Sequence, residues 1–255
     1  MAYPDYYLCM GHGVRRENSL NKHNIDRGVS LHDRWVVERQ NEYYYKLAKK
    51  LNYRSRASFK LMQIDDRFGI FRRGDAVVDL GASPGGWLQV AKERVGASGK
   101  VVGVDLQRIR PLDDVVTIVG DINDDSTMIE LLEVFGGRAD VVLSDMAPNI
   151  MGHYSTDHAR SVDLCMSAID VCDRVLRKNG KMVCKVFMGD LMDTLLNALD
   201  KKFRSVRVYS PAASRETSSE VYVISEGFLA KHNVDLRDLK VEEEKPAFVK
   251  KGVNI

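Results

Sequence analysis

Apolar side chains change their spacing along the chain, and these changes predict an alternation of strands and helices. The runs 76–80 and 139–144 are almost continuously apolar, as is typical of buried parallel strands, whereas residues 157–178 carry apolar side chains at steps of three and four. From residue 76 the predicted elements are strand 76–80, helix 86–95, strand 100–105, strand 115–119, helix 126–135, strand 139–144, helix 157–178, strand 181–187 and helix 190–202. Parallel strands with crossover helices follow from this order.

Two further strands are predicted at 205–209 and 220–225, joined by the polar turn 210–219. A link this short requires the two strands to pair antiparallel. The pattern therefore predicts an α/β fold with a seven-stranded, mostly parallel sheet, an antiparallel last strand and helices on both faces.

Two helices are predicted ahead of the sheet, at 33–51 and 55–68, with Ser55 placed to cap the second. Residues 1–33 lack an apolar period and are interpreted as a loosely ordered extension. We expect one folded domain over residues 34–228, in which 34–73 form a basic helical lead-in, and a tail over 229–255.

The composition fits a chain that buries a sizeable core. Of its 255 residues 44% are hydrophobic, and no apolar run is long enough to cross a membrane, so a soluble protein is expected. The four cysteines show no Cys-x-x-Cys pairing and the start of the chain does not resemble a secretory signal, which favours the cytoplasm. Cys165 and Cys172 fall on the apolar stripe of helix 157–178 and are predicted to pack in the core.

A metal site is not expected. Four residues near the start of the chain could in principle meet a metal ion, but their spacing matches no zinc pattern; they are Cys9, His12, His23 and His32.

Positive charge is concentrated at the front of the chain, although the whole protein carries a formal net charge of only +2. Residues 1–73 contain 15 Lys and Arg against 8 Asp and Glu. This asymmetry indicates a polyanionic partner held by the amino-terminal part, because phosphate contacts give affinity that does not depend on sequence. A solvated, lysine-rich helix face is the alternative interpretation.

A glycine-rich turn follows strand 76–80 directly, in the segment Asp79-Leu80-Gly81-Ala82-Ser83-Pro84-Gly85-Gly86-Trp87. Its three glycines allow the backbone to approach a bound group closely, and the carboxylate of Asp79 lies at the strand's carboxyl end. The turn lacks the Gly-Lys-Ser/Thr ending of phosphate loops and the Gly-x-Gly-x-x-Gly spacing of dinucleotide sites. The expected ligand is therefore a nucleoside without pyrophosphate, with S-adenosylmethionine as the candidate. Trp87 either belongs to the core or forms a wall of the pocket.

Acidic residues end three further strands and are expected to point into the same crevice. Asp105 is placed to accept the ribose hydroxyls of the cofactor, Asp121 to reach an adenine amino group, and Asp145 to lie near the reactive sulfonium. A single aspartate at such a position could simply cap the next helix. The interpretation rests on finding all three together with the glycine turn.

Two lysines and a glutamate supply the parts of a proton-transfer centre. Methyl transfer to a ribose hydroxyl needs a base, and burial or a neighbouring cation favours the neutral amine that can act as one. Lys185 interrupts the apolar strand 181–187, Lys60 lies on the helix before the sheet, and Glu220 begins the last strand. Taken singly, Lys185 could instead extend to solvent from an edge strand, and Glu220 could face solvent.

Five segments resemble the FtsJ-like ribosomal RNA ribose 2'-O-methyltransferases that use S-adenosylmethionine. In the family's order, they are residues 53–61, residues 78–87, Ser144-Asp145-Met146-Ala147-Pro148-Asn149, Lys185-Val186-Phe187 and Ser218-Ser219-Glu220-Val221-Tyr222. The resemblance spans residues 53–228 and implies a Rossmann-like methyltransferase fold. Ser83 stands where alanine is common, and the first thirty residues have no recognised counterpart.

The resemblance also implies roles for individual residues. It places a Lys-Asp-Lys-Glu catalytic tetrad on Lys60, Asp145, Lys185 and Glu220, with Lys185 as the proton acceptor. From the glycine turn and the resemblance together, the residues assigned to the cofactor are Asp79, Gly81, Gly85, Gly86, Trp87, Asp105, Asp121 and Asp145. The implied substrate is a uridine ribose of large-subunit ribosomal RNA, presented in the assembled subunit, and the enzyme is expected to be a monomer.

Three alternatives remain at this point. The same chemistry could act on a transfer RNA loop or an mRNA cap, or the chain could be a non-catalytic RNA-binding assembly factor. A base methyltransferase is disfavoured, because Asp145-Met146-Ala147-Pro148 stands where an Asn-Pro-Pro-Tyr type of loop would be.

Overall fold

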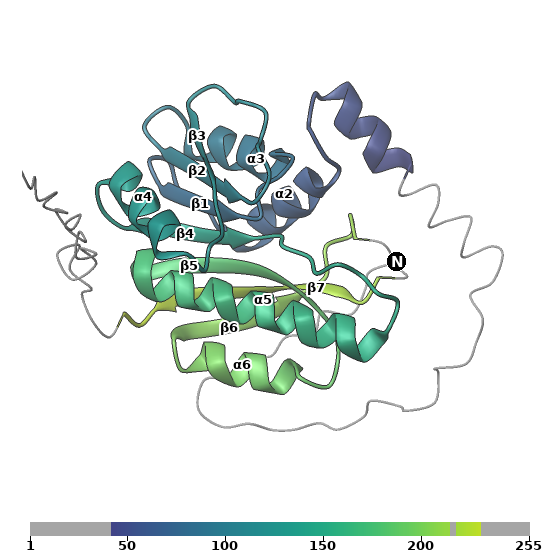
Figure 1. Cartoon of the computed structure of the whole chain (residues 1–255). Coiled ribbons are helices and arrows are strands. Elements are labelled where there is room, and N and C mark those ends of the chain that lie inside the picture. Colours follow the sequence, from purple (N-terminus) through teal and green to yellow (C-terminus); the bar gives the residue numbers. More distant parts are fainter. Residues whose placement is uncertain (1–41, 215–217, 231–255) are drawn as a thin grey trace, which may run out of the picture.

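A seven-stranded sheet forms the centre of the protein (Figure 1). The structure is a computed structural model that describes residues 42–214 and 218–230. The strands are β1 (Ala76–Leu80), β2 (Lys100–Asp105), β3 (Val115–Val119), β4 (Ala139–Ser144), β5 (Leu176–Phe187), β6 (Phe203–Tyr209) and β7 (Glu220–Phe228). The helices are α2 (Ala57–Phe68), α3 (Gly86–Val95), α4 (Asp125–Phe135), α5 (Tyr154–Val175) and α6 (Met192–Asp200), and residues 42–50 are also helical.

The strand order is β3-β2-β1-β4-β5-β7-β6, and β7 runs antiparallel to both of its neighbours. The predicted α/β fold with an antiparallel last strand is therefore confirmed. The structure adds the place of β7 in the strand order: it lies between β5 and β6 and does not form the edge of the sheet. This insertion places the start of β7 directly beside the end of β5, with Glu220 opposite Phe187.

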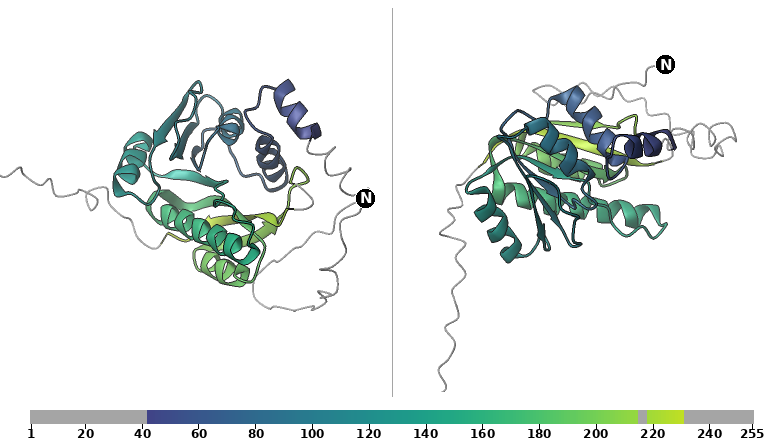
Figure 2. Two further views of the ribbon diagram at one scale, coloured as in Figure 1. Left: turned by 45° about the vertical axis from the view of Figure 1, so that its right-hand side comes forward. Right: turned by 90° about the horizontal axis from the view of Figure 1, so that it is seen from above.

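Helices cover both faces of the sheet (Figure 2), and the strands divide their side chains between the two faces. One cluster of buried side chains combines α4, α5 and α6 with Val78, Cys184 and Val223 of the sheet. The other combines α2 and α3 with the alternate positions Val77 and Val183. Because side chains alternate along a strand, Asp79 and Lys185 share the face that α2 and α3 cover.

The element boundaries differ from the predictions where local signals were ambiguous. α5 ends at Val175 instead of 178, because Leu176 is extended and pairs with Ala139 at the start of β5. The predicted cap of α2 by Ser55 is wrong, since the helix starts after Arg56 and has no side-chain cap. The Ser55 hydroxyl instead packs against Gly86 at the start of α3.

The prediction that Cys165 and Cys172 pack in the core is confirmed, since both are almost completely buried. Of the helix predicted at 33–51, residues 42–50 are helical and the earlier part lies outside the described residues. Residues 1–33, which include all four residues considered for a metal, and the tail beyond residue 230 also lie outside the described residues.

Within residues 42–214 and 218–230, no helix combines the length and apolar character that a membrane span requires. In that same part of the chain, no three His, Cys, Asp or Glu side chains are grouped so that they could hold a metal ion.

Candidate active site

Lys185 lies near the carboxyl end of β5, and its side chain is only 8% exposed. The pairing of Ser144 with Cys184 brings the next residue of each strand, Asp145 and Lys185, side by side. The Lys185 ammonium group donates to the Asp145 main-chain oxygen at 2.5 Å and lies 2.9 Å from the Asp145 Oδ1. Strand register therefore fixes one lysine–carboxylate pair.

A second lysine–carboxylate pair joins α2 to the start of β7. Lys60 of α2 forms an ion pair with Oε1 of Glu220, and both side chains are mostly buried. Ser214 Oγ lies 3.3 Å from the same carboxylate oxygen. Lys60 and Glu220 are 160 positions apart in the sequence, so only the packing of α2 on the sheet brings them together.

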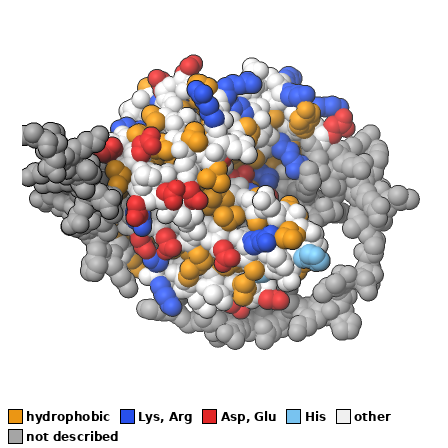
Figure 3. Space-filling model, viewed as in Figure 1, with side chains coloured by type: hydrophobic (Ala, Val, Ile, Leu, Met, Phe, Trp, Pro, Cys, Tyr) orange, Lys and Arg blue, Asp and Glu red, His pale blue; other side chains and the backbone are white. Residues whose placement is uncertain are grey.

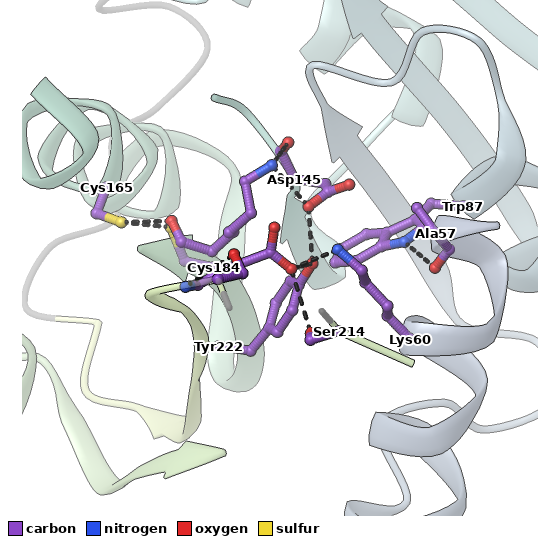
Figure 4. A network of polar contacts seen from close by, with 11 residues as sticks. Ala57, Lys60, Trp87, Asp145, Cys165, Cys184, Ser214 and Tyr222 are labelled. Carbon is purple, nitrogen blue, oxygen red and sulfur yellow. Dashed lines mark hydrogen bonds and ion pairs between the residues drawn. The ribbon is translucent and has the colours of Figure 1, made fainter. Parts of the chain in front are cut away.

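Tyr222 connects the two pairs (Figure 4). It lies opposite Lys185 in the sheet, and its hydroxyl group is 2.9 Å from Asp145 Oδ1 and 3.0 Å from Glu220 Oε1. The pKa of Tyr222 is raised well above its usual value by burial and by the adjacent carboxylates of Asp145 and Glu220. Tyr222 therefore keeps its proton and donates a hydrogen bond to one carboxylate or the other.

The charge of Glu220 is stabilised by its neighbours. Burial by itself would raise the pKa of this carboxyl, but Lys60, Lys185 and the Tyr222 hydroxyl outweigh burial and lower it. Glu220 is thus an anion that holds Lys60, while Asp145 holds Lys185.

The four residues predicted as a tetrad, Lys60, Asp145, Lys185 and Glu220, therefore form one connected network. The sequence analysis assigned no role to Tyr222 or Ser214. The signal for Tyr222 was available, because side chains two positions apart on a strand share a face and Tyr222 follows Glu220 by two. Ser214 had no comparable signal, since it lies in the turn before β7.

The acids at the carboxyl ends of the strands form a second part of the site. Asp79 is 1% exposed, and neither of its carboxylate oxygens has a hydrogen-bond partner. Its pKa is raised well above the usual value, first by burial and then by the charges of Asp145 and Asp105. Because an unpaired buried carboxylate is costly, Asp79 is suited to a positively charged group of a ligand.

The other two strand-end acids already make local contacts. Asp105 accepts the Ser83 main-chain N–H at 2.9 Å and the Gln107 N–H at 2.8 Å, so it ties the glycine turn to β2. Asp121 accepts from the main-chain and side-chain nitrogens of Asn123. Asp121 therefore makes a local turn contact and does not cap α4, whose N-cap residue is Asp124, while Asp105 holds the glycine turn.

The glycine turn is shaped by contacts with other parts of the protein. A Cβ atom on Gly81 would lie 2.5 Å from the Met146 side chain, and the φ of Gly81 is +71°. Gly85 has a φ of +104° and precedes α3. Trp87 is 3% exposed, donates from Nε1 to the Ala57 oxygen at 2.9 Å and packs near the Tyr222 ring. Trp87 is therefore part of the buried core, where it links the turn to α2.

Arg54 holds the turn from outside, a role that the sequence did not reveal. Its guanidinium group donates to the main-chain oxygens of Pro84, Arg110 and Pro111 at 3.1, 2.5 and 2.7 Å. The arginine thereby joins the glycine turn to the segment after β2.

Gly86→Ala is expected to destabilise the fold. A Cβ atom at Gly86 would lie 2.3 Å from Ser55 Oγ and 2.8 Å from Ser58 Oγ, and Ser58 is buried. Such overpacking costs about 1–3 kcal/mol, which chemical denaturation would measure as a lower free energy of unfolding. Gly137→Ala is the matched control, because an added Cβ meets nothing within 4 Å there. Equal stability of both variants would contradict the packing argument.

The strand order with one antiparallel strand, and the acids gathered around a glycine turn at the carboxyl ends of β1, β2 and β4, define a Rossmann-like methyltransferase. The family comparison is more specific. The chain belongs to the FtsJ-like methyltransferase family, whose model matches residues 53–228.

Individual relatives agree with this assignment. The chain is 46% identical over 216 residues to the ribosomal RNA large subunit methyltransferase E of Methanococcus aeolicus, covering 83% of this chain and 80% of the relative. It is 52% identical over 191 residues to the protein of the same name from Methanosarcina acetivorans, covering 74% and 70%. The crystal structure of a ribosomal RNA methyltransferase from Plasmodium falciparum is 27% identical with a TM-score of 0.63, covering 70% of this chain and all of that chain.

Proposed function

We propose that this methyltransferase transfers a methyl group from S-adenosylmethionine to a ribose 2'-hydroxyl of RNA, with Lys185 as the proton acceptor. The observation that carries the proposal is the connected network in which Asp145 holds Lys185 while Glu220 holds Lys60. A ribose hydroxyl is a weak acid, so its methylation calls for a base at the acceptor atom. A network with two buried amines has no evident purpose in a protein that only binds RNA.

The strand-end acids support S-adenosylmethionine as the cofactor. The unpaired carboxylate of Asp79 suits the ammonium group of the cofactor's methionine part. Asp105 would accept the ribose hydroxyls and Asp121 the adenine amino group, while Gly81, Gly85, Gly86 and Trp87 shape the adjoining turn. When bound, the cofactor supplies an electrophilic methyl group.

Each member of the network has a distinct role in the proposed reaction. Lys185 accepts the proton of the 2'-hydroxyl at Nζ, for which the amine must first be neutral. Asp145 orients the Lys185 amine, Glu220 keeps Lys60 in place, and Tyr222 fixes the two carboxylates relative to each other. Positioning of this kind is a large part of the catalysis of a bimolecular transfer.

Large-subunit ribosomal RNA is the proposed substrate, with a uridine as the target and the assembled subunit as the form in which it is presented. The names of the relatives support this choice. The helix 42–50 supports contact with a polyanion, because it exposes Tyr43, Tyr45 and Lys49 just before α2, and Lys49 lies 4.6 Å from the centre of the Tyr45 ring.

The decisive experiment measures methyl incorporation from labelled S-adenosylmethionine into four purified substrates. These are assembled large ribosomal subunits, free ribosomal RNA, transfer RNA and capped mRNA. We expect incorporation into the large subunit at one uridine, with the methylated linkage resistant to alkaline hydrolysis. Incorporation only into transfer RNA or capped mRNA would refute the proposed substrate, and methylation of a base would refute the chemistry. Absence of S-adenosylmethionine binding in calorimetry would favour the non-catalytic assembly factor.

A further inference from the structure

Five exposed apolar side chains lie on the two loops that follow Asp145 and Lys185 and on the first residue of α5, and we refer to them as the apolar ledge. The ledge consists of Ile150, Met151 and Tyr154 on the β4–α5 side and of Met188 and Leu191 on the β5–α6 side. Their exposed fractions run from 72% at Ile150 to 40% at Leu191. Ile150 follows Asp145 by five positions and Met188 follows Lys185 by three. The Met188 N–H donates at 2.7 Å to the oxygen of Ser219, the residue before Glu220, so this end of the ledge lies beside the network.

The first turn of α5 holds the β4–α5 loop in place. Both carboxylate oxygens of Asp157 are used for this, one accepting the Met151 N–H at 2.9 Å and the other the Gly152 N–H at 3.0 Å. Asp157 is itself buried. The same turn reaches the second loop, because the Tyr154 hydroxyl donates to the Met188 oxygen at 2.6 Å.

His158 fixes the β5–α6 loop from the next position of α5. Its Nε2 accepts the Leu191 N–H at 2.9 Å, and Nδ1 therefore carries the proton that is donated to the Phe187 oxygen at 2.8 Å. Ser161 adds a further bond, since its Oγ accepts the Phe187 N–H at 3.1 Å. Gly189 lets the loop lie against the imidazole, because a Cβ atom there would be 2.4 Å from the ring.

The ledge is therefore a pre-organised surface on two loops that are bonded to one helix. Exposed apolar side chains on a supported surface beside a catalytic site indicate binding of a ligand part that is itself apolar on one face. Figure 3 shows hydrophobic side chains together with a basic group, a histidine and acidic groups around the amino end of α5.

We infer that the apolar ledge receives the base of the nucleotide whose ribose is methylated. This inference rests on the proposed function and deepens it. Access of a catalytic group to a nucleotide inside a structured RNA requires that nucleotide to leave its stack, and the freed base then needs a new surface on which to stack. Contact with Met188 and Ile150 would hold the base while its ribose lies at Lys185. A partner protein is less well matched, because both loops of the ledge begin within five positions of the reacting pair and Met188 is bonded to the residue before Glu220.

The test combines a ledge variant with an RNA that lacks the target base. The nucleotide methylated by the wild-type enzyme is mapped first, and a second RNA is made with an abasic ribose at that position. The ledge variant is Ile150→Ser with Met188→Ser, and the matched control is Val116→Ser, since Val116 on β3 is 43% exposed like Met188 but lies on the far edge strand. Both residues of the ledge variant are exposed, so thermal denaturation should show a fold as stable as that of the wild type.

We expect the KM of the ledge variant for intact RNA to rise about tenfold, because two apolar side chains that would cover the base are replaced by small polar ones. The affinity for S-adenosylmethionine should not change, and the control should behave like the wild type. On the abasic RNA the KM of the wild type should rise by a similar factor. The ledge variant should show no further rise, because the contact between base and ledge is a single interaction that the abasic RNA has already lost.

Two outcomes would overturn the inference. In the first, the ledge variant has the wild-type KM for intact RNA. In the second, the abasic ribose raises the KM of the ledge variant by the same factor as that of the wild type, which would place the ledge against another part of the substrate. Both outcomes leave the proposed function intact as long as wild-type enzyme methylates the mapped ribose. Failure of the wild type to methylate any ribose overturns the proposed function and the inference together.

Discussion

Replacing Lys185 by methionine is expected to lower the rate of methyl transfer about 1,000-fold while S-adenosylmethionine still binds, since a positioned base contributes about 10²- to 10⁴-fold. Methionine keeps the length of the side chain but cannot accept a proton. The contacts from Lys185 to Asp145 are lost as well, which leaves Asp145 with the hydroxyl of Tyr222. Single-turnover kinetics at saturating cofactor, together with calorimetry of cofactor binding, would separate the chemical step from binding.

The matched control for this prediction lies on the same strand. Lys181 is the same residue type, four positions earlier on β5, where it contacts Glu226 and the Gly69 oxygen at the opposite end of the sheet. Lys181→Met should therefore keep the wild-type rate per folded molecule. If Lys185→Met were as active as Lys181→Met, Lys185 could not be the proton acceptor, and the role of the network would be structural.

Asp79→Asn is expected to weaken S-adenosylmethionine binding about 100-fold, because removing one partner of a buried charge pair costs about 2–5 kcal/mol. The asparagine amide has nearly the same shape as the carboxylate, but it carries no charge that could pair with an ammonium group. Asp79 has no hydrogen-bond partner, so loss of its charge disturbs no internal contact. Isothermal calorimetry at neutral pH would measure the change in affinity.

The same substitution should alter how stability depends on pH. Because the pKa of Asp79 in the folded protein is raised above its ordinary value of 3.8, the folded state binds more protons than the unfolded state above that pH. Its contribution to stability is fully present below pH 3.8 and is lost as the pH rises toward the folded pKa. In the ligand-free protein, Asp79→Asn should therefore reduce the decline of the melting temperature with rising pH.

Asp75→Asn is the control that separates these two effects. Burial also raises the pKa of Asp75, but Asp75 lies just before β1, at the other end of that strand from the glycine turn. This variant should change the pH dependence of stability and leave cofactor affinity at the wild-type value. If both variants lost cofactor affinity equally, the loss would come from the changed stability of the fold and not from the missing charge of Asp79.

The sequence was sufficient for the order and type of the elements. The steps of three and four in α5 and the almost continuous apolar runs of β1 and β4 are local patterns, and they give the right element even where the boundary moves by three residues, as at Val175. The Ser55 cap failed because the competing contact comes from Gly86, which is remote in the sequence. The insertion of β7 between β5 and β6 was also beyond the sequence, since a short link fixes pairing of β6 with β7 but not which of them meets β5.

By itself, the sequence determined which residues could carry the chemistry. A lysine inside an apolar strand is unfavourable unless it faces a site, and the sequence alone shows that cost at Lys185. The strand-end acids became informative only because three of them occur together with the glycine turn. Only the tertiary structure decided how these residues are paired. The register of β4, β5 and β7 places Asp145 and Tyr222 beside Lys185, and the packing of α2 carries Lys60 to Glu220. The physical reason is that hydrogen bonds and ion pairs act over about 3 Å, a distance that folding sets and that separation along the chain does not.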